Sequence, residues 1–154
     1  MPVVTSHSLD KAIGDPYTNE CLGKYSTLLD TWDMIVSVWL PVDDYVHAFG
    51  PADVQRYSDI FSNMSRLDAI HVPGGDGGPG FFSPTWFAAV KQVASILRQH
   101  HPHARVTCSA NSFNSTSLEH FMAALARPDT QVLLPFPSLL PHARIYTHTA
   151  NRHD

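Results

Sequence analysis

The stretch D-A-I-H-V-P-G-G-D (Asp68–Asp76) decides the fold of this chain. A short apolar run that ends in glycines and an acid predicts a buried β-strand followed by a loop. Ser83 and Pro84 then supply a helix cap and a first helical residue. The long helix that follows carries apolar residues at helical spacing, and Pro102 ends it. Together these features predict a strand, a glycine-rich loop and a helix in succession.

Three further apolar runs repeat this unit on either side. They are Ile35–Val42, Ala104–Ser109 and Gln131–Pro135. Helical patterns separate them, from Asp15-Pro16 towards Leu29, over Ala52–Met64 and over Thr116–Ala126. We expect the first helix to bury Leu22, Tyr25, Leu28 and Leu29, and Thr116 with Glu119 predicts a capping box. Alternating strands and helices predict parallel strands joined by right-handed crossovers.

The predicted fold class is α/β, a parallel β/α repeat. We favour a partial (β/α)8 barrel, because a complete barrel needs about 250 residues and the chain has 154. A flavodoxin-like three-layer α/β/α sheet is the alternative. Residues 1–137 would form a single domain, with an irregular tail over 138–154. A partial barrel exposes unpaired strand edges, so self-association through those edges is a further expectation.

Composition limits the partners that we expect. A net charge of −4 without a basic cluster argues against nucleic acid. No signal peptide and no long apolar span are seen, so we expect a cytoplasmic protein without membrane contact. Two cysteines make no disulfide framework. Carbohydrate or another small molecule remains as the expected ligand, and we expect no cofactor and no metal.

The candidate catalytic residues are acids that follow predicted strands. Asp76 lies in the loop after the strand, where Gly74 and Gly75 let backbone approach a ligand. Asp43 and Asp44 follow the preceding strand. Two carboxylates on neighbouring strands supply the acid and base that glycoside hydrolysis needs. The alternative is that these acids are solvated turn residues.

Other residues at the same strand ends are candidates for substrate binding. Trp39 and Tyr45 would stack on a sugar ring, Asn111 would hydrogen-bond a sugar hydroxyl, and His71 would reach a ligand if its side chain points inward. A tryptophan or a histidine within a strand is more often part of the core.

Cys108 is the alternative nucleophile, because it lies at a strand end before a helix. A buried thiol that packs as a small hydrophobe is the commoner case. The segment His100–His103 contains three histidines, but their spacing does not fit a zinc signature. We predict a solvated helix end there.

The motifs resemble those of two families. R-L-D-A-I-H-V-P-G-G-D (Arg66–Asp76), H-P-H-A-R-V-T-C-S-A-N-S-F-N (His101–Asn114) and L-E-H-F (Leu118–Phe121) resemble a group of glycoside-hydrolase-like (β/α)8-barrel proteins. The resemblance covers about half the chain, from Leu40 to Leu125, and implies a site at the carboxyl ends of the strands. The G-G-D segment also looks like that of hexosaminidase-type barrels, where a catalytic Glu follows the Asp. Here Gly77 follows, so only Asp76 is carried over, as a substrate-binding acid.

The second resemblance is to the DJ-1/PfpI class of flavodoxin-like proteins. Asp68–Gly75 and Cys108 match its P-G-G loop and strand-end cysteine in order and approximate spacing. Ser109 and Ala110 follow the cysteine where that family usually has His-Gly. This resemblance implies a cysteine-dependent hydrolase or a redox-responsive protein.

The sequence therefore leaves three functions open. The first is a glycosidase-like hydrolase or carbohydrate-binding protein, which as a barrel fragment would be inactive if its site is incomplete. The second is the cysteine-dependent protein, and the third is a non-catalytic binding module.

Overall fold

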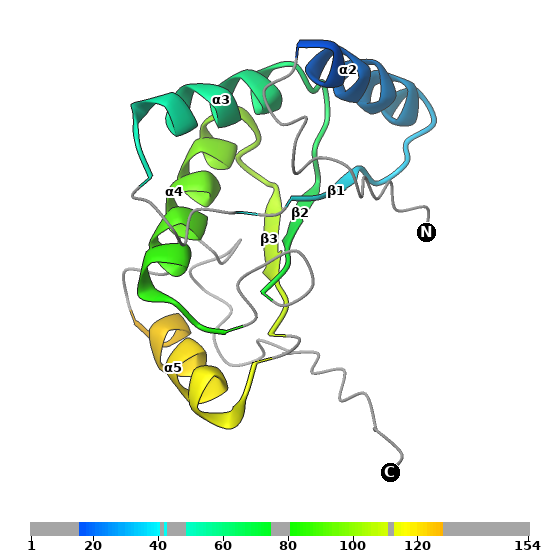
Figure 1. Cartoon of the computed structure of the whole chain (residues 1–154). Helices are drawn as coiled ribbons and strands as arrows, with labels where there is room; N and C mark the ends of the chain where they lie inside the picture. The colour runs from blue at the N-terminus through cyan, green and yellow to red at the C-terminus, as the bar shows by residue number, and fades with distance from the viewer. Residues whose placement is uncertain (1–15, 41, 43–48, 75–80, 111–112, 128–154) are drawn as a thin grey trace.

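The computed structural model describes residues 16–40, 42, 49–74, 81–110 and 113–127. Within them four helices alternate with three strands in the order α2, β1, α3, β2, α4, β3, α5 (Figure 1). The bounds are α2 Pro16–Thr31, β1 Ser37–Trp39, α3 Pro51–Ser62, β2 Ala69–Val72, α4 Pro84–His100, β3 Arg105–Cys108 and α5 Ser115–Leu125.

The three strands form one parallel sheet in the order β1-β2-β3. The central strand β2 places Ile70 beside Val38 of β1 and beside Val106 of β3. The predicted α/β class and the parallel sheet are thereby confirmed. Because the strands are parallel and neighbouring, their carboxyl ends lie along one edge of the sheet.

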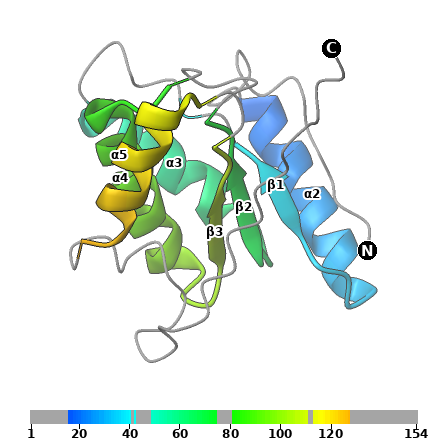
Figure 2. The same ribbon diagram turned by 90° about the horizontal axis from the view of Figure 1, so that it is seen from below.

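The side chains of β1 and its flanks alternate strictly between buried and half-buried. Val36, Val38, Leu40 and Val42 are almost fully buried in the core, whereas Ser37 and Trp39 are half-buried. The buried face belongs to the same core as α3 and α4. Figure 2 shows α3, α4 and α5 grouped on one side of the strands. Helices α3, α4 and α5 therefore cover one face of the sheet.

Helix α4 begins as the sequence predicts. The hydroxyl of Ser83 accepts a hydrogen bond from the backbone N–H of Trp86 at 3.4 Å, and Pro84 occupies the first turn. Its buried face is Trp86, Phe87, Ala89, Val90, Val93, Ala94, Ile96 and Leu97. This apolar stripe is wide because the helix packs on α3 and also shares one core with the strands.

The histidines at the end of α4 bind α3. His101 Nε2 lies 2.9 Å from the carbonyl oxygen of Phe61, and His100 Nε2 lies 2.9 Å from the Ser58 hydroxyl. The prediction of a solvated helix end is wrong for these two residues, because both rings find partners on the neighbouring helix. No group of metal-binding side chains occurs in the described part of the chain.

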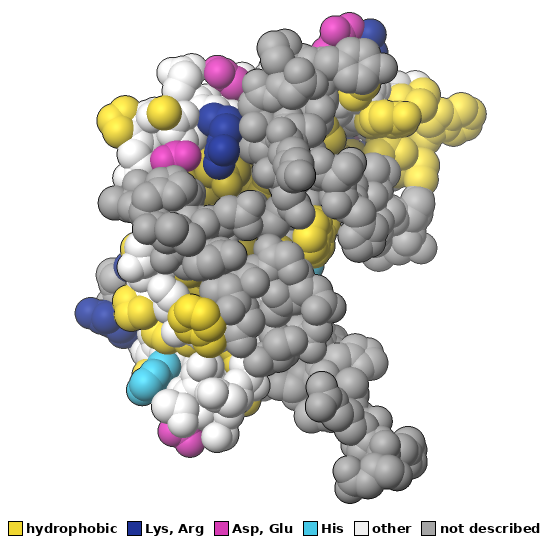
Figure 3. Space-filling model, viewed as in Figure 1, with side chains coloured by type: hydrophobic (Ala, Val, Ile, Leu, Met, Phe, Trp, Pro, Cys, Tyr) yellow, Lys and Arg dark blue, Asp and Glu magenta, His cyan; other side chains and the backbone are white. Residues whose placement is uncertain are grey.

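Helix α2 buries only part of the predicted face, since Leu22 is buried and Leu29 packs against the core. Tyr25 and Leu28 are 58% and 54% exposed, whereas Leu22 and Ser26 are buried. Gly23 approaches the carbonyl oxygen of Asn63 so closely that a Cβ would lie 2.6 Å from it. The backbone approach and the hydrogen bonds of Ser26 turn a partly polar face inward. Hydrophobic side chains consequently gather on the surface over the α2 end of the molecule (Figure 3).

Helix α5 is capped two residues before the predicted Thr116. The side chain of Asn114 accepts a hydrogen bond from the backbone N–H of Ser117 at 2.8 Å. Phe121 of α5 joins an aromatic cluster with Phe82, Trp86, Phe87 and Phe113. The centroids of contacting rings in this cluster lie 5.7–6.4 Å apart. This cluster attaches α5 to the amino-terminal half of α4.

Two predicted features lie outside the described residues, namely the fourth strand within Gln131–Pro135 and the tail over 138–154. Across the described helices, none combines the length and the apolar character that crossing a membrane requires.

Candidate ligand-binding edge of the sheet

Three side chains form a row across the sheet near its carboxyl edge. The parallel register places Trp39 beside His71, and His71 beside Thr107. Thr107 is exposed, and Trp39 and His71 are half-buried. Neighbouring residues on each strand point the other way into the core. The row therefore lies on the face of the sheet opposite the described helices α3 and α4.

The hydrogen bonds of His71 decide which ring nitrogen carries its proton. Thr107 Oγ1 donates to the carbonyl oxygen of Ile70 at 3.1 Å, and His71 Nδ1 lies 3.0 Å from the same hydroxyl oxygen. Because a hydroxyl has one proton to give, Nδ1 must be the donor to Thr107 Oγ1. In the neutral ring, Nε2 then carries the lone pair and can accept a hydrogen bond or a proton.

Burial keeps this ring neutral. It lowers the pKa of His71 from the ordinary value of 6.5, because a charged imidazolium is poorly solvated there. At neutral pH His71 is thus an acceptor through Nε2 and a donor through Nδ1. Arg105, which β3 carries two residues before Thr107, adds a positive charge to the same face.

Gly74 lies two residues after the end of β2, and the packing around it explains why this position is a glycine. A Cβ at this position would lie 2.2 Å from the carbonyl oxygen of Ser109 and 2.9 Å from Cζ of Phe113. The backbone N–H of Gly74 also donates to the Ser109 hydroxyl at 3.2 Å. The absent side chain lets the loops that follow β2 and β3 approach each other, which draws the two strand ends together.

Most of the predicted site residues lie outside the described part of the chain. These are Asp43, Asp44, Tyr45, Gly75, Asp76 and Asn111. The structure describes the residues at which the chain leaves the sheet, namely Val42, Gly74 and Ala110. Of the predicted set it brings Trp39 and His71 together in one row and places Gly74 at the end of β2.

Cys108 lies beside Val72 on the face that packs against the apolar core. Burial raises the pKa of its thiol to about 12. A nucleophilic cysteine requires a lowered pKa instead, so that the thiolate is present at neutral pH. This placement favours a packing role for Cys108.

Sequence reasoning missed Thr107, the partner that fixes the tautomer of His71. The sequence feature that could have indicated Thr107 is its position one residue before Cys108, which places it on the opposite face of the strand. A threonine in a strand is common, however, so only the register identifies it.

No family model, no curated protein and no solved structure matches this chain. The resemblances to glycoside-hydrolase-like barrels and to the DJ-1/PfpI class therefore remain predictions.

Proposed function

We propose that this protein binds or hydrolyses carbohydrate at the carboxyl ends of its strands. The observation that carries the proposal is the row of Trp39, His71 and Thr107 on the face of the sheet opposite the described helices α3 and α4. Indole faces stack on the apolar faces of sugar rings, and imidazole nitrogens bond sugar hydroxyls. Such a combination is typical of a ligand site with one apolar wall and a few polar groups.

The proposed architecture is a segment of a (β/α)8 barrel. In a barrel the strands follow one another in order with every crossover helix outside, and the ligand site is built at the carboxyl ends of the strands. The order β1-β2-β3 without reversal, and the grouping of α3 with α4 on one side, support this architecture. A reversal of strand order beyond β3 would support the flavodoxin-like alternative.

Each proposed residue has a role. Trp39 stacks on a sugar ring, as Tyr45 would, and His71 Nε2 accepts from a sugar hydroxyl, while Asn111 bonds another. Asp76 and either Asp43 or Asp44 are the proposed acid pair. In hydrolysis one carboxylic acid protonates the leaving oxygen, while the other carboxylate activates water or attacks the sugar. Asp43 directly follows Val42, and Asp76 follows Gly74 by two residues, so both acids are covalently close to the strand ends.

The test is a titration of Trp fluorescence with a panel of oligosaccharides, together with hydrolysis of aryl glycosides. Trp39→Ala should weaken sugar binding about two- to tenfold, because a stacked aromatic ring contributes about 0.5–1.5 kcal/mol. Asp76→Asn should abolish hydrolysis. Asp59→Asn is the matched control, since Asp59 is an exposed residue of α3 away from the sheet edge.

The outcomes separate the open functions. Sugar binding without hydrolysis, lost in Trp39→Ala, would identify an inactive carbohydrate-binding fragment. An activity lost in Cys108→Ala and retained in Asp76→Asn would support the cysteine-dependent alternative. Absence of binding to every sugar in the panel would contradict the proposal.

A further inference from the structure

Helix α2 carries a row of apolar side chains on the side that is turned away from the core. Tyr25 is 58% exposed, Leu28 is 54% exposed, and Trp32, in the turn that follows the helix, is 72% exposed. Cys21, one turn before Tyr25, is partly exposed. We call these four residues the α2 stripe, and Figure 3 shows hydrophobic side chains gathered over this end of the molecule. Single exposed apolar residues are normal, whereas a contiguous row of them indicates an interaction surface.

The spacing of the α2 stripe is the same in both directions along the chain. From Cys21 to Trp32 the steps are four, three and four residues, which is the apolar spacing of paired helices. In an antiparallel pair of α2 helices, Cys21 therefore faces Trp32 of the second copy, and Tyr25 faces Leu28. The smallest side chain meets the largest one, as interdigitating layers require. A dimer with two-fold symmetry needs this kind of self-complementary patch.

The charges beside the α2 stripe favour a second copy over a charged partner. Lys24 Nζ lies 2.5 Å from Glu20 Oε1, and both Asp30 and Asp33 pair with Arg66. These charges are compensated within the chain, whereas an anionic lipid surface or a nucleic acid selects clusters of unpaired Lys and Arg. An antiparallel second helix also brings the partial positive charge of one helix end near the partial negative charge of the other.

We propose that α2 pairs antiparallel with α2 of a second copy of this chain. The two-fold axis would pass between the levels of Tyr25 and Leu28, and the indole of Trp32 would cover the sulfur of Cys21 in the other copy, a favourable contact. On the scale of about 150–250 Å² for a whole aromatic side chain, the exposed fractions of the stripe correspond to roughly 400 Å² per copy. A standard interface buries about 800 Å² per partner, so we expect a weak dimer with a Kd on the order of 10–100 μM.

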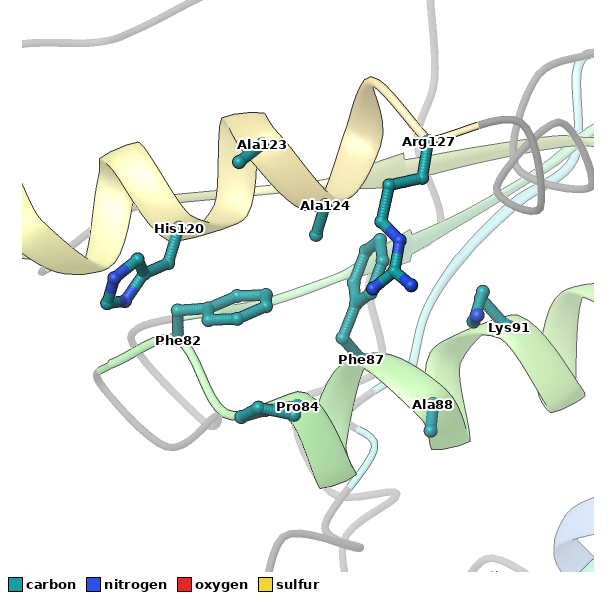
Figure 4. A pocket seen from close by; sticks show the side chains of 9 residues that line it. All are labelled: Phe82, Pro84, Phe87, Ala88, Lys91, His120, Ala123, Ala124 and Arg127. Carbon is teal, nitrogen blue, oxygen red and sulfur yellow. The ribbon is translucent and has the colours of Figure 1, made fainter.

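Sedimentation equilibrium up to about 500 μM protein tests the dimer. Leu28→Glu places two carboxylates near the axis and removes two apolar contacts, so the Kd should rise at least about tenfold. Ala123→Glu is the matched control, because it adds the same charge at an exposed position of α5, in the groove between α4 and α5 (Figure 4). This variant should leave the Kd unchanged.

A mixture of two variants separates loss of the interface from loss of the fold. Leu28→Lys alone should dissociate the dimer as Leu28→Glu does, because like charges again meet near the axis. An equimolar mixture of the two variants should form a dimer, since opposite charges then face each other. Recovery in the mixture requires that both variants are folded.

Cysteine crosslinking tests the antiparallel register, in a Cys108→Ala background at high protein concentration. In Trp32→Cys the introduced thiol should lie opposite Cys21 of the second copy, so mild oxidation should give a covalent dimer. With Trp32 present no such dimer should form, because the two Cys21 residues lie about 16 Å apart along the helix axes, and a disulfide spans about 4.4–6.8 Å between Cα atoms. For the same reason Cys21→Ala combined with Trp32→Cys should lose the crosslink.

Three results would overturn the proposal. They are a chain that stays monomeric up to about 500 μM, a dimer that Leu28→Glu leaves intact, and a disulfide between the Cys21 residues of two copies. The first result, together with sedimentation of the chain on anionic vesicles, would assign the α2 stripe to a lipid surface. The second would place the contact at a sheet edge or, if Ala123→Glu dissociates the dimer, between α4 and α5. None of these variants changes the row of Trp39, His71 and Thr107, so sugar binding is tested separately.

Discussion

Burial of Cys108 makes its thiol less reactive, because burial raises the pKa of the thiol. It packs against the core, and its pKa is raised to about 12. In Cys21→Ala, where Cys108 is the remaining thiol, alkylation by iodoacetamide in mildly alkaline buffer should be at least about 100-fold slower in the folded protein than in guanidinium. The reason is that the thiolate fraction falls tenfold for each unit by which the pKa rises.

Cys108→Ala, which leaves Cys21 as the remaining thiol, is the control for reagent quality and folding. The same burial decides how the folding stability of the protein changes with pH. The unfolded thiol ionises near its ordinary value of 9.0, whereas the folded thiol resists ionisation up to about 12. Stability from this group is therefore present below about pH 9 and is lost as pH rises above it. Rapid alkylation of folded Cys108 would favour the cysteine-dependent function instead.

His71 offers a second test at the level of a single residue. Nitrogen NMR should show the proton on Nδ1 and the lone pair on Nε2. Thr107→Val removes the acceptor of the Nδ1 proton, so the preference for this tautomer should be lost. A spectrum of the parent protein with Nε2 protonated at neutral pH would contradict the hydrogen-bond assignment.

The lowered pKa of His71 also predicts a pH effect on stability. The unfolded ring takes up a proton as pH falls through about 6.5, whereas the folded ring resists protonation. The contribution of His71 is thus present above this pH and is lost as pH falls below it. His71→Gln should flatten the acid limb of a plot of unfolding free energy against pH.

At the scale of elements, Asp68 joins the beginnings of β1 and β2. Its Oδ2 accepts from the backbone N–H of Val36 at 2.8 Å and from Nε of Arg66 at 2.9 Å. Asp68→Ala should lower the unfolding free energy by about 1–3 kcal/mol, because the N–H of buried Val36 loses this acceptor. Asp30→Ala, which removes a 3.4 Å ion pair with the same arginine from a half-exposed helical position, should cost under about 1 kcal/mol. Urea titrations of both variants measure the difference, and equal losses would contradict this explanation.

The elements also show which parts of the fold the sequence could predict. Helix α4 was predictable because Ser83, Pro84 and its apolar spacing lie within one segment. The cap of α5 was missed because Thr116 and Glu119 offer a competing pattern two residues after Asn114. The buried face of α2 was predicted only in part, because Ser26 is buried through bonds to Arg66, forty residues away. Neighbouring residues are enough to predict where a helix or strand forms. Which of its faces is buried depends on residues that are distant in the chain.

The candidate site likewise depends on residues that are distant in the chain. Trp39 and His71 could be nominated from their strand positions, but their alignment with Thr107 depends on the register of three strands.

At the scale of the whole molecule, α2 is attached differently from the rest. Helices α3 and α4 share the apolar core with the sheet, whereas α2 contributes only Leu22 and the partly buried Leu29 to that core and adds polar contacts. Buried Ser26 donates to the carbonyl oxygen of Arg66 at 2.6 Å and accepts from its N–H at 2.8 Å. Few apolar contacts imply a low free energy of local opening. We therefore expect α2 to open before the sheet unfolds.

Hydrogen exchange tests this order. The amides of α2 should exchange faster than those of β2, which is paired on both sides. Ser26→Ala should accelerate exchange across α2 about tenfold or more, because two hydrogen bonds to a buried hydroxyl are lost, and should leave β2 nearly unchanged. Thr27→Ala is the matched control, because its exposed hydroxyl bonds only within α2, to the carbonyl oxygen of Gly23. Equal acceleration of α2 and β2 in Ser26→Ala would mean that the molecule opens as one unit, in which case the polar contacts of α2 are part of the global fold.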